Sequence, residues 1–97
     1  MIPEEVRQAI ADAFEADRVE VTRHFWDELR ADAFLLADVR CALEALSGVN
    51  DMGRDRLGNP KYEVTGPAID GRELSVICSF KETGALLLIT VYEETES

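Results

Sequence analysis

Few side chains in this sequence could transfer protons in a reaction. The chain has one histidine, His24, and two tyrosines, Tyr62 and Tyr92. Cleavage of RNA without a metal needs a base, an acid and cations that stabilise the charge developing on the phosphate. His24 and Tyr92 could exchange the protons, and Thr90 shares one face of a predicted strand with Tyr92. His24, Thr90 and Tyr92 are therefore the candidate catalytic residues.

Cations that could bind an anion gather in the second half of the chain. From Arg54 to Lys81 there are five basic and four acidic residues, whereas the whole chain has a net charge of -10. An anion would find its most favourable potential in this stretch. Arg54, Arg56 and Lys61, around the predicted turn LGNP, are the candidate nucleic-acid-binding residues. The alternative is that they are solvated loop charges.

The surroundings of His24 also allow a structural role. Thr22 is a good N-cap, so His24 lies in the first turn of a predicted helix. Glu28 follows four residues later, at the spacing where two side chains pair on one helix face. His24 is thus either an acid–base group or the partner of Glu28. Phe25 and Trp26 are either a stacking surface for a base or part of the core or of an interface.

Composition and charge exclude several classes of protein. The chain has 97 residues, of which 46% are hydrophobic, so we expect one folded domain over residues 1–97. The net charge of -10 repels nucleic acid and anionic membranes at long range. The apolar run LLLITVY is far shorter than the roughly 20 residues that span a bilayer. The first residues lack the features of a signal peptide, so we expect a cytoplasmic protein.

The two cysteines, Cys41 and Cys78, form no CxxC motif. Zinc sites need three or four clustered thiolates or imidazoles, so we expect no metal site. We expect both thiols to be buried and free, with a disulfide between them as the alternative. Nucleotide-binding and triad-hydrolase motifs are also missing, so we expect no cofactor.

Hydrophobic periodicity predicts three helices in the first half of the chain and strands in the second. The helices are predicted from Pro3 to about Ala16, from the Thr22 cap to about Arg30, and from about Leu36 to Leu46. RVEV, between the first two helices, is predicted to be an extended link. The strands are predicted within Asn50–Pro60, as an irregular or edge strand, and in KYEVT, ELSVICSF and ALLLITVY. This order predicts an α+β fold, with about three N-terminal helices on one face of a small C-terminal antiparallel sheet of three to four strands.

One face of this sheet is expected to stay open. Simple alternation along the last strand places Leu86 and Leu88 on the same face as Thr90 and Tyr92. Ser75, Ile77, Ser79 and Lys61 are predicted to lie beside them. An apolar patch with a polar end on an open face favours docking of a partner chain.

Three pieces of the sequence together resemble a known family. They are HFWDEL followed by ADVRCALEAL, then GNPKYEVTG, and then DGRELSVIC with LLLITVYE. Their order resembles the small domain-of-unknown-function family 4258, which is usually grouped with RelE/ParE-like and BrnT-like toxins. The resemblance covers about residues 18–94, and residues 1–17 form an extra N-terminal helix. It implies a RelE-like fold with helices on a small antiparallel sheet.

The resemblance also bears on activity. Members commonly place a histidine at the position of His24, an arginine where this chain has Glu28, and a histidine where it has Ser75. Because the last two differ and the chain is acidic, we expect a protein-binding or assembly module rather than an enzyme. Its partner would be another protein or a second copy in a homodimer. The alternative is a RelE-like, metal-independent ribonuclease toxin of a toxin–antitoxin pair, for which RNA is the substrate.

Overall fold

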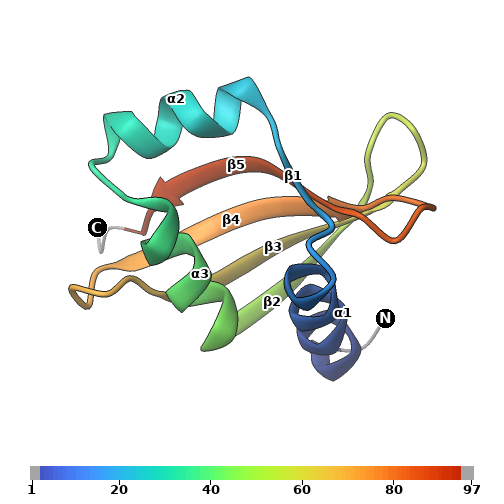
Figure 1. The fold of residues 1–97 in the computed structure, drawn as a ribbon, viewed down its shortest axis with the longest axis horizontal. Coiled ribbons are helices and arrows are strands. Elements are labelled where there is room, and N and C mark those ends of the chain that lie inside the picture. The colour runs from blue at the N-terminus through green and yellow to red at the C-terminus, as the bar shows by residue number, and fades with distance from the viewer. Residues whose placement is uncertain (1–2, 95–97) are drawn as a thin grey trace.

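The computed structural model describes residues 3–94, so residues 1–2 and 95–97 of the predicted domain lie outside the described part. The α+β class is confirmed (Figure 1). The elements, in chain order, are α1 (Pro3–Glu15), β1 (Val19–Val21), α2 (Arg23–Ala31), α3 (Leu36–Glu44), β2 (Gly48–Arg54), β3 (Pro60–Pro67), β4 (Glu73–Phe80) and β5 (Leu86–Glu93). The predicted helices and the predicted edge strand are therefore present, with ends that differ by a few residues.

The sheet is larger and more varied than the sequence predicted. It has five strands in the order β1-β5-β4-β3-β2, and β1 runs parallel to β5 while the other pairs are antiparallel. The predictions of three to four strands and of a purely antiparallel sheet were therefore wrong. The additional strand is β1, which lies in the segment RVEV that was predicted to be an extended link. Its three residues, paired from Val19↔Leu86 to Val21↔Leu88, are too few to show an alternating pattern.

The helices and one face of the sheet share a single hydrophobic core (Figure 1). Helix α1 buries Val6, Ile10 and Ala13, while α2 contributes Phe25 and Leu29. In Figure 1, α2 lies beside β5 and α3 crosses the sheet over β3 and β4. The side chains of the sheet that face these helices are Tyr62, Val64, Leu74, Val76, Cys78, Leu86, Leu88 and Val91. Removal of this apolar surface from water is the main term that stabilises the arrangement.

Helix α3 approaches the sheet most closely at Gly66 of β3. A Cβ atom at this position would lie 2.2 Å from the carbonyl oxygen of Ala42. Real Cβ atoms do not approach backbone oxygens that closely, so only glycine lets α3 lie at this height.

A bulge in β5 changes which residues face the core. Ile77 of β4 pairs with Thr90, whereas the next residue, Cys78, pairs with Leu88, so Ile89 is the extra residue. Leu86 and Leu88 therefore face the core, and beyond the bulge the core position passes to Val91. The prediction that Leu86 and Leu88 share a face with Thr90 and Tyr92 was wrong, because simple alternation has no extra residue.

Polar groups from α2 and its cap cover the edge of β5 beyond the short β1. The Thr22 hydroxyl donates to the carbonyl of Ile89 at 3.0 Å and accepts from the Phe25 amide at 3.1 Å. A carboxylate oxygen of Glu28 accepts from the Val91 amide, and one of Asp32 accepts from the Glu93 amide. The strand edge is thus satisfied by a helix instead of another strand.

Within residues 3–94, no helix has both the length and the apolar character needed to cross a membrane.

Candidate functional site

The face of the sheet opposite the helices carries side chains that are neither core nor fully solvated. On this face, Lys61, Glu63 and Thr65 of β3 pair with Ser79, Ile77 and Ser75 of β4, respectively. On the other side of β4, Ile77 pairs with Thr90 of β5 and Ser75 pairs with Tyr92. We call this surface the open face. One end carries cations beside the apolar side chains of Leu87 and Ile89, Ile77 lies in the middle, and the other end carries hydroxyls and carboxylates.

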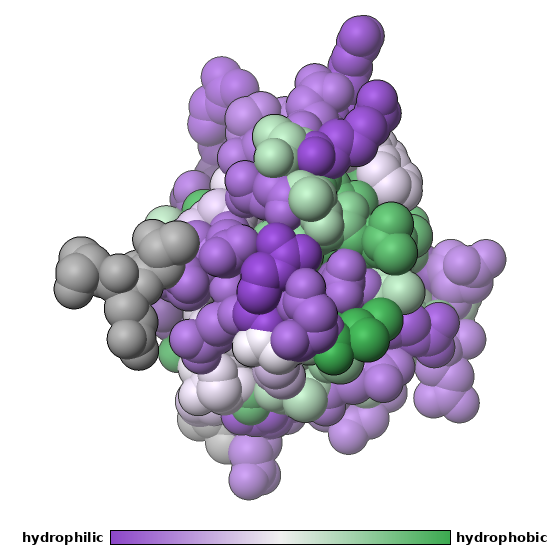
Figure 2. Space-filling model, turned by 90° about the vertical axis from the view of Figure 1, so that its left-hand side faces the viewer, coloured by the Kyte–Doolittle hydropathy of each residue, from purple (hydrophilic) through white to green (hydrophobic). Residues whose placement is uncertain are grey.

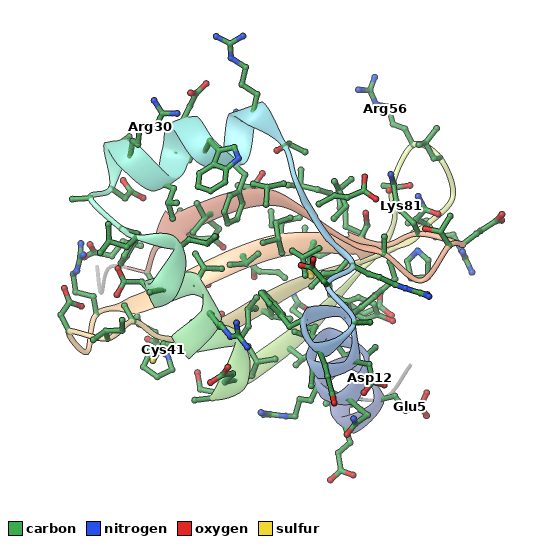
Figure 3. All side chains as sticks on the ribbon, in the orientation of Figure 1. Glu5, Asp12, Arg30, Cys41, Arg56 and Lys81 are labelled. Atoms are coloured by element: carbon green, nitrogen blue, oxygen red, sulfur yellow. The ribbon has the colours of Figure 1, made fainter. Side chains whose placement is uncertain are left out.

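At the first end, the three predicted anion-binding residues come together. Arg54, Arg56 and Lys61 line one pocket of about 630 Å³. The remaining lining residues are Thr22, Asp55, Leu57, Leu87 and Ile89. The connection between β2 and β3 forms one wall, and β5 forms the floor. Arg56 extends from this connection into solvent (Figure 3).

The carboxylate of Asp55 holds the β2–β3 connection in shape. One of its oxygens accepts from the amides of Leu57 and Asn59, both at 2.9 Å, and the other accepts from the Asn59 side chain at 3.3 Å. The hydrogen bond from the Asn59 amide is the largest of the causes that lower the pKa of Asp55. A turn organised by one aspartate in this way has a defined conformation, so the pocket wall is preformed.

At the opposite end of the open face, hydroxyls and carboxylates form a hydrogen-bonded network. The Tyr92 hydroxyl donates to the Glu63 carboxylate. The Ser75 hydroxyl lies 2.7 Å from that of Thr65 and donates to Glu94 at 2.8 Å. Burial, followed by the hydrogen bond to Glu63 and the charge of that carboxylate, raises the pKa of Tyr92 to about 12. Tyr92 is therefore a protonated hydrogen-bond donor at neutral pH.

Among the described residues, His24 pairs with Glu28 and lines neither the pocket nor the hydrogen-bonded network. Its Nε2 atom is 3.0 Å from a carboxylate oxygen of Glu28, as the four-residue spacing predicted, and its side chain is 66% exposed. The residues that line the pocket include neither His24 nor Tyr92. Thr90 lies on the open face beside Ile77. The structure therefore brings the three cations together but does not gather the three catalytic candidates around them.

The aromatic pair on α2 is divided between two environments. Phe25 is fully buried in the core, while Trp26 is partly exposed. They do not present two neighbouring rings on one surface, so a two-ring stacking platform is not formed.

Several residues of the open face were not singled out from the sequence. Leu57, Leu87 and Ile89 supply the apolar part of the pocket, and Glu63 holds Tyr92. The alternation of KYEVT already placed Glu63 on the same face as Lys61, so this signal was available. The contact between the β2–β3 connection and β5 joins residues about thirty positions apart, so no local sequence pattern could predict it.

A second surface lies at the end of the molecule shown in Figure 2, which is mostly hydrophilic with separate hydrophobic patches. The α2–α3 and β3–β4 connections lie at this end of the molecule (Figure 1), and their residues Leu35 and Ile69 are 69% and 66% exposed. The buried carboxylate of Asp38 accepts from both of their amides, at 2.8 and 3.0 Å, and so holds the two connections together.

The cysteines are free, as predicted. Cys78 is buried, whereas Cys41 is partly exposed, so the prediction that both thiols are buried was wrong for Cys41. Burial raises the pKa of the Cys78 thiol to about 12. Over residues 3–94, no group of three or more histidine, cysteine, aspartate or glutamate side chains is placed to hold a metal ion.

Comparison with known families gives one match. The family described as Domain of unknown function (DUF4258) matches residues 21–93, which is most of the chain. The chain belongs to the DUF4258 family. The DUF4258 match takes in α2, α3 and strands β2 to β5, and therefore the whole open face, whereas α1 lies outside it. No curated protein matches the chain, and no solved structure matches it.

Proposed function

We propose that this DUF4258 chain is a non-catalytic protein-binding module that docks its partner on the open face. The observation that carries the proposal is the apolar strip formed by Ile77, Leu87 and Ile89, which are only partly buried on a face that no helix of residues 3–94 covers. Leu57, beside them, is 83% exposed. Contiguous exposed apolar surface on a small domain usually marks an interface. The partner is another protein or a second copy of this chain.

The environment of the catalytic candidates supports a binding role. His24 is paired with Glu28, and the Tyr92 hydroxyl is engaged by Glu63. A general acid or base has to reach the proton that it transfers, together with the other reacting groups. Neither residue lines the pocket that holds the cations.

Site-specific photocrosslinking tests the proposal. A photoreactive amino acid at position 89, in the apolar strip, should crosslink a protein partner or a second copy in the cells that make this protein. The same amino acid at Glu5, which is exposed on α1 (Figure 3), is the matched control. Light scattering then separates self-association from a different partner. A monomer at all concentrations, together with equal crosslinking at positions 89 and 5, would contradict the proposal.

A second candidate function is a RelE-like ribonuclease of a toxin–antitoxin pair. It is favoured by the convergence of Arg54, Arg56 and Lys61 on one pocket, since cations stabilise the developing phosphate charge. Expression of the wild-type protein should then slow growth and cleave RNA, and His24→Ala, Tyr92→Phe and Lys61→Ala should remove both effects. If the wild-type protein leaves growth and RNA intact, this function is ruled out in favour of the first.

A further inference from the structure

The cations in the pocket make no ion pair with the residues that the structure describes, in contrast to several other cations of the chain. Arg72 pairs with Asp70 and Glu93, and Lys81 pairs with Glu20. Among residues 3–94, Arg54, Arg56 and Lys61 make no ion pair, and the guanidinium of Arg54 donates to the Gly58 carbonyl at 2.6 Å. Three cations and one carboxylate, that of Asp55, therefore line one pocket, which is net positive in a chain whose net charge is -10. Such a pocket attracts a negatively charged group at short range.

The same pocket offers apolar surface beside the charges. Leu57, Leu87 and Ile89 line it together with the cations. Ser79 lies in register between Lys61 and Leu87. Its hydroxyl is fully buried and makes no hydrogen bond in this conformation. It lies close enough to Asp55 to make a small contribution to the lowered pKa of that carboxyl. A ligand that satisfies this surface needs acidic groups and apolar groups a few ångströms apart. An acidic segment of protein with alternating apolar side chains meets this requirement.

The surroundings of the pocket limit how long a negatively charged ligand can be. Glu63 and Glu94 lie at the opposite end of the open face, and Glu20 lies on β1, next to β5. A nucleic acid strand carries a charge at every nucleotide, so its ends would extend from the cations onto these carboxylates. A short peptide can place a few carboxylates on the cations and nothing on the acidic end.

We propose that the pocket between the β2–β3 connection and β5 binds a short segment of a partner protein in which acidic side chains alternate with apolar ones. This inference rests on the proposed binding function and names the partner's chemistry. The cations select the acidic side chains, and the strip formed by Leu87 and Ile89 takes the apolar ones.

Titration of the full, isotope-labelled chain with defined probes tests this proposal by NMR. The probes are short capped peptides of alternating Glu and Leu, of alternating Lys and Leu, and of alternating Glu and Ser, together with an oligouridylate of similar length. The Glu–Leu peptide should shift the amide signals of residues 55–59, 87 and 89, and added salt should weaken its binding. The other three probes should bind at least about tenfold more weakly.

Charge-reversal variants sharpen the test. Arg56→Glu and Lys61→Glu, made together, should weaken binding of the Glu–Leu peptide by about tenfold or more, since two attractive contacts become repulsive. Arg30→Glu is the matched control, because Arg30 is an exposed cation of α2 that makes no ion pair among the described residues (Figure 3). It should leave the affinity within about twofold. The salt dependence of peptide binding is measured on the wild-type protein, so this part of the test holds even if a variant fails to fold.

Failure of this inference can be told apart from failure of the proposed function. If the Lys–Leu peptide binds as well as the Glu–Leu peptide, or the reversed charges have no effect, the inference is overturned. Crosslinking at position 89 would then still support the binding module. Tighter binding of the oligouridylate than of any peptide overturns the inference and supports the ribonuclease.

Discussion

The Nε2 atom of His24 lies 3.0 Å from the Oε1 atom of Glu28, and the same oxygen accepts a hydrogen bond from the Val91 amide at 3.4 Å. Glu28 thus joins the start of α2 to the edge of β5. Removal of the exposed imidazole by mutation uncovers no buried group, whereas removal of the carboxylate leaves the Val91 amide without its acceptor. The two residues of this pair therefore differ in importance for stability.

We expect His24→Ala to lower the free energy of unfolding by about 0.5 kcal/mol or less, as for other exposed pairs four residues apart. Glu28→Ala should cost about 1 kcal/mol or more, because the Val91 amide also loses its acceptor. Urea denaturation measures both. Arg23→Ala, at an exposed neighbour without an ion pair among the described residues, is the control. Equal costs for His24→Ala and Glu28→Ala would show that the contact with Val91 contributes nothing.

Thr22 should tolerate serine but not valine. Its hydroxyl caps α2 through the Phe25 amide and also satisfies the carbonyl of the bulged Ile89. Thr22→Val keeps the shape and loses both hydrogen bonds, so we expect a loss of about 1–2 kcal/mol in thermal or urea unfolding. Thr22→Ser keeps both bonds and should lose less than about 0.5 kcal/mol. A serine variant as unstable as the valine variant would point to the methyl group instead.

Gly66→Ala should be severely destabilising. The added methyl group would meet the backbone of Ala42 at 2.2 Å, so α3 has to move off the sheet, at a cost of about 3 kcal/mol or more. Gly48→Ala is the matched control in the neighbouring strand, where the nearest atom to the new methyl is 3.9 Å away. It should be neutral or slightly stabilising. Calorimetry on both variants checks the difference.

Tyr92 should make the protein sensitive to high pH. Burial and the Glu63 carboxylate raise its pKa from 10.0 to about 12 in the folded chain. The protonated hydroxyl therefore contributes stability that is fully present below about pH 10 and is lost as the pH rises toward 12. In Tyr92→Phe, the decline over this window should be shallower, as measured by urea unfolding at each pH.

Ultraviolet titration of tyrosinate gives an independent check on the same pair. Glu63→Gln removes the negative charge beside Tyr92, so the pKa of Tyr92 should fall from about 12 toward 10.0. An unchanged titration in Glu63→Gln would mean that burial alone sets this pKa.

Local patterns predicted the features that depend on neighbouring residues. The N-cap at Thr22 and the pairing of His24 with Glu28 depend on residues within one or two turns of each other, and both are confirmed. The polar composition of Asn50–Pro60 predicted an irregular or edge strand, and β2 is an edge strand with an irregularity. The cation-rich stretch around Arg54 was also visible, because charge can be counted along the chain.

Features that depend on distant contacts were not predictable in the same way. The bulge at Ile89 lies within a run of apolar residues, where either face would accept either side chain, so no alternation marks the extra residue. The parallel pairing of β1 with β5 joins segments from opposite ends of the chain, and it depends on how α2 packs beside β5. The packing of the β2–β3 connection against β5 depends on the whole sheet order, and it is this contact that turns three scattered cations into one pocket.

The covering of β5 by α2 has a consequence for how molecules of this chain can meet. The described sheet ends at the short strand β1 on one side and at β2 on the other, and beyond β1 the polar groups of β5 are occupied by Thr22, Glu28 and Asp32, so this part of β5 offers no template for another strand. The edge at β2 is interrupted by an irregularity between Asp51 and Arg54. A sheet with a three-residue strand at one edge and an interrupted strand at the other is protected against growing into a fibril. Any assembly would then have to form through the faces of the sheet and give a closed oligomer of fixed size, since pairing of strand edges would give an open-ended fibril.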